Sequence, residues 1–266
     1  MMSYQRLPSS WSSFRVIPIP KGNSTSSFRP IALSSALCKI FEHMLKSRLD
    51  WWLKSGAILS DNLFAFRKGR GTLECLSIFS GHIYHAFNDK KFLVATFIDI
   101  RGAFDSVHIP TLISHLSSLD LPPTFCNLIR SLFSSWSLSF FSPFGSHNTR
   151  STCTGLPQGS CLSPILFNMY INFIAKHLSS RDHQFLIYAD DIVIFSTNKS
   201  LNLAIETLNI ALMDLNDILN RSFCTVAPEK CKTVIFTRRR YLNPPSIFLD
   251  STIIPFVPEA QICIIN

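Results

Sequence analysis

The 266-residue sequence lacks an apolar segment long enough to span a membrane, because charged or polar residues interrupt every candidate. Its N-terminus lacks the basic-then-apolar order of a secretory signal. Internal repeats and low-complexity linkers are also missing. We therefore expect an intracellular chain without a membrane partner, long enough for one large domain or two small ones.

Cysteine pairs with metal-binding spacing are missing too. No Cys-x-x-Cys and no Cys/His cluster of zinc-finger spacing occurs. The eight cysteines are scattered, at Cys38, Cys75, Cys126, Cys153, Cys161, Cys224, Cys231 and Cys263. Several lie in apolar helical patterns, where a reduced thiol acts as a small buried hydrophobe. We expect structural thiols in a reducing compartment.

Acidic residues are fewer than basic ones, at 17 against 25, which gives a net charge of +8 and a pI near 9.2. That balance suits a polyanionic partner, although it is compatible with any basic protein. Apolar residues make up 47% of the chain, enough for a substantial core.

Two adjacent carboxylates, Asp190 and Asp191, lie between short apolar runs within residues 185–195. Both runs are rich in β-branched and aromatic residues, which indicates two half-buried strands joined by a tight turn at Ala189-Asp190. A plain polar turn is the alternative. Like charges held side by side on strands favour neutralisation by a divalent cation.

A third carboxylate, Asp99, ends another apolar strand, residues 92–99. Three carboxylates on two strands form a plausible cradle for a pair of magnesium ions, which phosphoryl and nucleotidyl transfer require. Elsewhere the patterns predict a strand from Arg15 and a capped helix from Ser34 or Ser35 to Gly56. They further predict helices over 72–87, from Pro110, from Pro122, over 165–178 and over 201–219, and a hairpin of 137–141 with 150–152. This mixture without strict alternation favours the α+β class.

Several segments, in order, resemble the reverse transcriptase domain of non-LTR retrotransposons of the long interspersed element type. The matching segments are Ile19-Pro-Lys21, Phe28-Arg-Pro-Ile31, Phe66-Arg-Lys-Gly-Arg70, Phe97 to Val107, Gly155 to Asn168, Tyr188-Ala-Asp-Asp191 and Pro228-Glu-Lys-Cys-Lys232. Each is weak alone, but their shared order is specific. The resemblance implies a right-hand polymerase with an antiparallel palm sheet on helices, and an RNA-directed DNA polymerase that extends a primer with dNTPs.

The resemblance also implies a domain plan. Residues 1–92 would form a fingers-like region, 93–247 the palm with a fingers insertion allowed within it, and 248–266 the start of a primer grip. No thumb follows and no endonuclease domain precedes, so we expect a piece of a longer polyprotein or a decayed copy. An inert nucleic-acid-binding remnant is one alternative function, and a related polymerase with a different template or sugar preference is the other. The expected location is the nucleus or the cytoplasm, and nuclear action is implied by the resemblance alone.

For catalysis, the resemblance and the carboxylate pattern agree on Asp99, Asp190 and Asp191 as metal ligands, with the Ile100 carbonyl added by resemblance. Two Mg²⁺ ions are expected, with Mn²⁺ as a substitute. Either Lys230 or Lys232 would protonate the pyrophosphate leaving group, and the sequence does not choose between them.

The resemblance implies that five residues contact the incoming dNTP, namely Lys21, Arg29, Phe104, Gln158 and Gly159. The Phe104 ring would exclude a 2′-hydroxyl; the alternative is an ordinary core residue. A helix-entry loop is the alternative for Gln158 and Gly159, and solvated charge is the alternative for Lys21 and Arg29.

An RNA template and a DNA primer would contact Arg67, Lys68, Arg70 and Tyr188, with a solvated basic loop as the alternative for the three cations. Ala65 stands where the family usually has glycine, a change that matters only if the backbone there needs positive φ. Arg238-Arg-Arg240 could contact nucleic acid or mark nuclear import.

Overall fold

The computed structural model describes residues 7–20, 28–141, 147–181, 183–241 and 243–259. The chain divides into two compact units, each assembled from two segments. Unit 1 takes residues 1–58 and 104–170, and unit 2 takes residues 59–103 and 171–266. The division into a fingers-like region, palm and primer grip is a functional one and stays a prediction.

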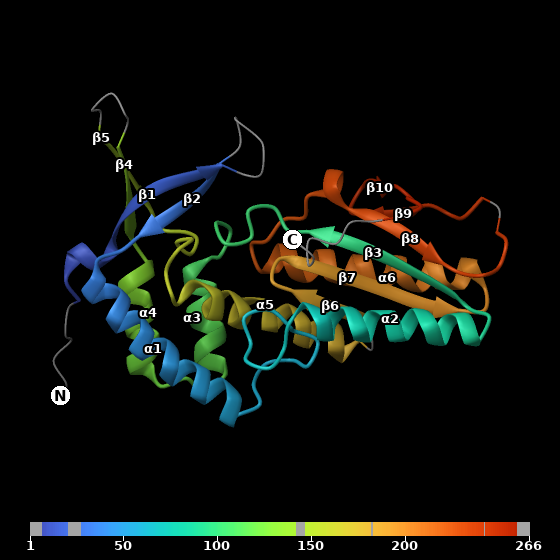
Figure 1. The fold of residues 1–266 in the computed structure, drawn as a ribbon, viewed down its shortest axis with the longest axis horizontal. Coiled ribbons are helices and arrows are strands. Elements are labelled where there is room, and N and C mark those ends of the chain that lie inside the picture. Colours follow the sequence, from blue (N-terminus) through green and yellow to red (C-terminus); the bar gives the residue numbers. More distant parts are fainter. Residues whose placement is uncertain (1–6, 21–27, 142–146, 182, 242, 260–266) are drawn as a thin grey trace. The chain divides into compact units, whose positions relative to one another are not determined.

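Unit 1 contains a four-stranded sheet in the order β2-β1-β4-β5 (Figure 1). β1 (Ser13–Pro20) pairs antiparallel with β2 (Phe28–Leu33) and parallel with β4 (Trp136–Phe141), which pairs antiparallel with β5 (His147–Thr152). Phe14, Ala32 and Trp136 form its core, with the rings of Phe14 and Trp136 edge to face at 5.6 Å. The predicted strand from Arg15 and the predicted hairpin are both confirmed.

The helices of unit 1 begin where the sequence signals predict. In α1 (Ala36–Ser55) the Ser35 hydroxyl caps the first turn by accepting the Cys38 N–H. Proline lies in the first turn of both α3 (Ile109–Ser118) and α4 (Pro123–Phe133), where its missing N–H costs nothing. A short 3₁₀ turn, η1 (Ser9–Ser12), precedes β1. Helix α5 (Ser163–Ser180) has its first half in unit 1 and its second half in unit 2.

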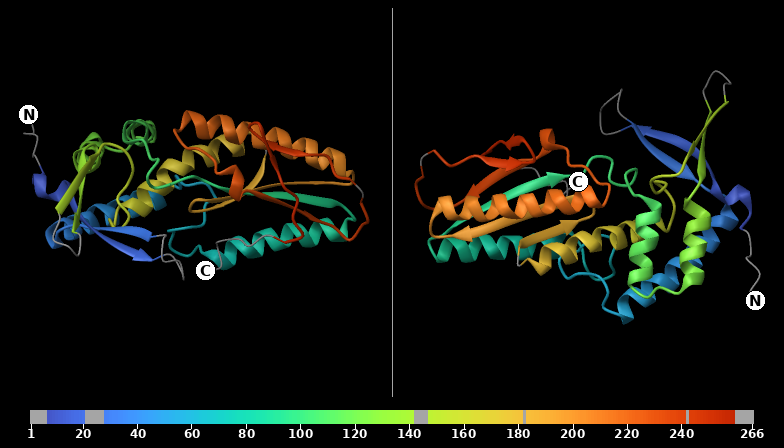
Figure 2. Two further views of the ribbon diagram at one scale, coloured as in Figure 1. Left: turned by 90° about the horizontal axis from the view of Figure 1, so that it is seen from above. Right: turned by 180° about the vertical axis from the view of Figure 1, so that it is seen from behind.

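Unit 2 is built on an antiparallel sheet in the order β6-β7-β3-β8. Its strands are β3 (Phe92–Asp99), β6 (Gln184–Tyr188), β7 (Asp191–Asn198) and β8 (Lys232–Phe236). Helices α2 (Thr72–Asn88) and α6 (Leu201–Arg221) cover opposite faces of this sheet (Figure 2). Because both faces are covered, most residues of β3 are apolar and buried.

The two faces of the unit 2 sheet are packed differently. On the α2 side, Phe79 lies edge to face with Phe97, Phe195 and Phe236. The buried Thr96 and Thr233 hydroxyls bond to each other at 2.9 Å. After η2 (Pro228–Lys230) and β8, a small hairpin of β9 (Ile247–Leu249) and β10 (Thr252–Ile254) follows. The α+β architecture is therefore confirmed, and no helix in the described ranges has the length and apolar character needed to cross a membrane.

Candidate active site

The three carboxylates lie at the same end of the unit 2 sheet, where β3 ends and β7 begins. Asp99 is the last residue of β3 and Asp191 the first of β7, and the two face each other in the antiparallel register. Ala189 and Asp190 form the two-residue turn between β6 and β7, with Ala189 at a φ of +56°. A positive φ in the first turn residue matches the twist of a tight hairpin. The fold therefore brings together the aspartates that the sequence singled out.

This grouping concentrates negative charge. Burial, followed by the charges of Asp190 and Asp99, raises the pKa of Asp191 to about 6. The Lys230 ammonium lies 2.8 Å from Asp99 Oδ2, and this hydrogen bond raises the pKa of Lys230. One cation of the chain thus already offsets part of the charge.

The three carboxylates supply oxygen ligands of the kind that a divalent cation needs. In the described part of the chain, no three His, Cys, Asp or Glu side chains converge closely enough to hold a metal ion as they stand. The backbone positions nevertheless suit convergence, since directly opposed residues of an antiparallel pair have Cβ atoms about 5 Å apart. Carboxylate oxygens are the ligands that Mg²⁺ and Mn²⁺ prefer. The residues fit such an ion in chemistry and register.

Ile100 follows Asp99 in a short bridge to the segment before η2. The Asp99 carbonyl accepts the Ala227 N–H at 2.9 Å, and Arg101 N–H donates to the Thr225 carbonyl at 2.8 Å. These bonds fix the backbone directly after β3, while the Ile100 side chain is buried. The assignment of the Ile100 carbonyl as a metal ligand stays a prediction.

The two candidate lysines differ in position. Lys230, in η2, contacts Asp99, whereas Lys232 lies on β8 opposite Phe97 and is exposed. Only Lys230 of this pair has a recorded ion pair with a carboxylate in the described residues. Of the two lysines, Lys230 is therefore the one that lies beside the carboxylates.

In unit 1, the loop that carries Gln158 and Gly159 is held against β2. The Ala32 N–H donates to the Gln158 carbonyl at 2.6 Å. Gly159 has a φ of +124°, and a Cβ there would lie 2.4 Å from the Ala32 carbonyl oxygen. Only glycine allows both this conformation and this approach. Arg29 lies on β2, three residues before Ala32 and opposite Ile19, and is exposed. Lys21 lies outside the described residues.

Phe104 belongs to the same unit and is fixed to the same loop. Its ring stacks on the buried Phe167 ring, with centroids 4.6 Å apart, and its carbonyl accepts the Leu156 N–H at 2.8 Å. Gly155 donates to the Val107 carbonyl at 2.8 Å, and a Cβ on Gly155 would meet the Asp105 backbone at 3.0 Å. Phe104 is half-buried rather than enclosed. Its role as a sugar gate stays a prediction.

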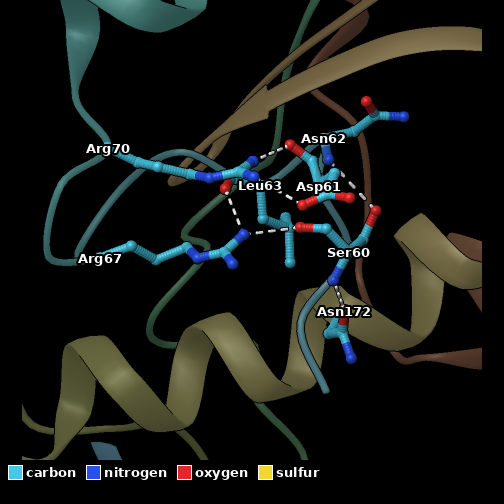
Figure 3. A network of polar contacts seen from close by, with 7 residues as sticks. All are labelled: Ser60, Asp61, Asn62, Leu63, Arg67, Arg70 and Asn172. Atoms are coloured by element: carbon cyan, nitrogen blue, oxygen red, sulfur yellow. Dashed lines mark hydrogen bonds and ion pairs between the residues drawn. The ribbon is translucent and has the colours of Figure 1, made fainter. Parts of the chain in front are cut away.

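The basic segment near residue 67 is partly turned onto its own loop (Figure 3). Arg67 donates to the carbonyls of Ser60 and Leu63 at 2.7 and 2.9 Å, and burial lowers its pKa. Arg70 pairs with Asp61 through the carboxylate at 2.5 Å and also reaches the Asp61 carbonyl. These arginines hold the loop together, and their template contact stays a prediction.

Lys68 and Tyr188 are the two remaining predicted contacts of template and primer. Lys68 is exposed, while the half-buried Tyr188 ends β6 opposite Asp191 and packs on the core below α2. Positive φ falls on Phe66, at +55°, and Ala65 is not among the residues with positive φ. Alanine in place of the family's usual glycine is therefore tolerated by the backbone.

Glu42 is a buried residue that sequence reasoning missed. It is fully buried in α1, and its carboxylate accepts the Cys161 N–H at 2.8 Å. Burial raises its pKa. The spacing of Glu42 could have predicted its burial, because it places this residue on the apolar face of α1. The buried residues of that helix are Cys38, Glu42, Leu45, Leu49 and Leu53.

An antiparallel sheet covered by helices, with paired carboxylates at a hairpin tip, defines a right-hand polymerase. The model of the reverse transcriptase (RNA-dependent DNA polymerase) family matches residues 19–248. The chain belongs to this family, whose members use divalent metal ions.

Similar proteins agree with this membership. The chain is 30% identical over 246 residues to a probable RNA-directed DNA polymerase from transposon BS of Drosophila melanogaster, covering 89% of this chain and 27% of that protein. It is 27% identical over 241 residues to the RNA-directed DNA polymerase from mobile element jockey of the same species, covering 87% and 26%. The chain therefore spans about a quarter of the length of these relatives.

A solved structure shares the fold. Telomerase from Candida tropicalis, in complex with a TWJ fragment of telomeric RNA, superposes with a TM-score of 0.61 at 14% identity, covering 93% of this chain and 45% of that one. At this identity the likeness supports the polymerase fold only.

Proposed function

We propose that the chain catalyses RNA-templated DNA synthesis, adding deoxynucleotides to a primer 3′-hydroxyl. The observation that carries the proposal is the register that sets Asp99 opposite Asp191, with Asp190 at the adjoining turn. Family membership supports the reaction class. The action is proposed to take place in the nucleus, on the ground of the retrotransposon resemblance.

Asp99, Asp190 and Asp191, with the Ile100 carbonyl, are the proposed ligands of two magnesium ions, for which manganese can substitute. Bound there, the ions would lower the pKa of the primer hydroxyl and neutralise the triphosphate. Lys230 is the proposed general acid, because its ammonium already lies beside Asp99 and can give a proton to departing pyrophosphate.

Unit 1 supplies the proposed dNTP contacts. Arg29 and Lys21 suit phosphate, Gln158 offers a donor and an acceptor, and the Gly159 backbone permits close approach. Phe104 is proposed to select deoxyribose, supported by the ring stack and backbone bond that fix it. Arg67, Lys68, Arg70 and Tyr188 remain the proposed contacts of template RNA and DNA primer.

The test is primer extension on an RNA template annealed to a DNA primer, with magnesium and dNTPs. Asp190→Asn/Asp191→Asn should abolish extension while leaving the fold intact. A matched control is Asp217→Asn/Asp250→Asn, which removes two exposed carboxylates from the same unit and should extend as the unmodified chain does.

Extension that persists in the Asp190/Asp191 variant would contradict the proposal. Absence of extension by the unmodified chain, together with retained primer-template binding in a salt titration, would favour the inert nucleic-acid-binding remnant instead.

A further inference from the structure

Three loops meet at the end of the unit 2 sheet opposite the carboxylates. They are residues 89–91 before β3, 199–200 after β7 and 237–241 after β8. The register brings them together, since Phe92 faces Asn198 and Leu93 faces Phe236. β3 spans about 23 Å at about 3.3 Å per residue, so this end lies that far from Asp99.

These loops concentrate positive charge, and we name their cations the basic edge. The basic edge consists of Lys90, Lys91, Lys199, Arg238, Arg239 and Arg240. The same loops contain one carboxylate, Asp89, which pairs with Lys91 at 2.7 Å. The hydrogen bond from Lys91 lowers the pKa of Asp89. Six of the chain's 25 lysines and arginines thus lie in these three loops.

The basic edge is held in place by Arg239. Its guanidinium donates to the carbonyls of Lys90 and Lys199, at 3.3 and 2.8 Å, and lies 4.7 Å from the centre of the Phe92 ring. One side chain therefore ties all three loops together. Because Arg239 fixes the backbone, the neighbouring cations act as a preorganised set.

An aromatic side chain lies within the basic edge. Tyr241 packs edge to face on Phe92, at 6.4 Å, and remains 42% exposed. Arg238 lies 5.1 Å from the centre of the Phe87 ring. Lys90, Lys199, Arg238 and Arg240 are exposed. Cations that track a phosphate backbone beside an exposed ring on which a base can stack are the usual components of single-strand recognition.

We propose that the basic edge is a second nucleic-acid-binding surface, which takes a single-stranded RNA segment by its phosphates and stacks one base on Tyr241. Its distance from Asp99 means that RNA held there does not occupy the candidate active site. The surface would tether a strand while another part of the molecule engages the primer. This binding does not depend on polymerase activity.

The test is fluorescence anisotropy with a short, unstructured, labelled RNA, titrated from about 50 to 200 mM salt. The variant Lys90→Gln/Lys199→Gln/Arg240→Gln removes three exposed cations and spares Arg239. Each lost phosphate contact lowers the slope of log affinity against log salt by about 0.7, so the slope should fall by about 2. Arg238→Gln, as a second variant, should lower it by about 0.7.

The matched control is Arg48→Gln/Lys176→Gln/Arg221→Gln, which removes three exposed cations elsewhere and gives the same net charge. Its slope should stay near that of the unmodified chain. Equal losses in both triple variants, or no loss in either, would overturn the proposal. Ultraviolet cross-linking should map RNA to the peptide that contains Tyr241. Binding of anionic lipid vesicles but not RNA at this edge would also overturn it.

Two results distinguish RNA binding at the basic edge from the proposed polymerase activity. On a primer-template too short to reach from Asp99 to the basic edge, the triple variant should extend as the unmodified chain does. If the unmodified chain extends nothing but the slopes behave as expected, the polymerase proposal fails and the basic edge stands.

Discussion

At the scale of single residues, backbone conformation and close approach set strict limits. Gly159 has a φ of +124°, and a Cβ on it would collide with the carbonyl oxygen of Ala32. We expect Gly159→Ala to displace the loop that carries Gln158, and to raise the KM for dNTPs by about tenfold or more, in line with the cost of small misplacements of binding groups. Steady-state primer extension measures this. Gly69→Ala is the comparison, because Gly69 also has positive φ but has no atom near its Cβ position; equal effects would refute the close-approach explanation.

Phe104 offers a test of selection between sugars. If its ring excludes a 2′-hydroxyl, Phe104→Val should admit ribonucleotides and reduce the dNTP over rNTP preference by about tenfold or more, because a steric clash is removed. Phe167→Leu tests the stack beneath it and should weaken selection less, since the Phe104 ring remains. Unchanged sugar preference in Phe104→Val would return Phe104 to the role of an ordinary packing residue.

At the scale of elements, α1 and the loop after β5 are joined by one buried carboxylate. Glu42→Leu should leave the half-buried Cys161 N–H without its Glu42 acceptor and lower the free energy of unfolding by about 1–3 kcal/mol. Glu42→Gln keeps an acceptor at the same place and should cost less. Urea denaturation of the two variants provides the comparison, and equal losses would show that packing volume, not the hydrogen bond, matters at this site.

Helix α3 makes stability depend on pH. Burial lowers the pKa of His115, whose ring lies 5.8 Å from that of Tyr170. The unfolded chain therefore binds a proton more readily than the folded one, so stability should fall as pH decreases through the ordinary histidine pKa. His115→Phe keeps a ring there and should flatten this fall between about pH 7.5 and 5.5. Denaturant midpoints measure it, with the exposed His85→Gln as the control. A fall of the same size in His115→Phe would locate the dependence elsewhere.

Elements were predictable wherever local patterns decide the outcome. Two runs rich in β-branched and aromatic residues, on either side of a short turn, predicted the β6–β7 hairpin with Asp190 at its tip. The start of α1 was predicted at Ser34 or Ser35, and Ser35 is the residue that caps it. Pairings between distant segments were not predictable in this way. The parallel contact of β1 with β4 and the three loops of the basic edge depend on register between strands far apart in sequence. The burial of Glu42 was missed because charge argues for exposure unless a partner is known.

At the scale of the whole molecule, the proposed site residues fall into two groups along the chain. The carboxylates and Lys230 belong to unit 2, while Arg29, Phe104, Gln158 and Gly159 belong to unit 1. Substitutions in unit 1 should therefore act mainly on dNTP affinity and selection, and those in unit 2 mainly on kcat. The sequence left two lysines open in unit 2, and the geometry distinguishes them, because only Lys230 has a recorded contact with Asp99 in the described residues.

This distinction gives a prediction about the chemical step. Lys230→Gln removes the proposed proton donor and should lower kcat by about a hundredfold with little change in the KM for dNTPs, a size typical of general acid catalysis. Lys232→Gln removes an equal charge from the same segment, opposite Phe97 on the sheet, and should change kcat less than about threefold, since exposed charges act weakly at a distance. Single-turnover extension separates the chemical step from product release. A larger loss in Lys232→Gln than in Lys230→Gln would reverse the assignment, because the contact with Asp99 would then serve only to fix the carboxylate.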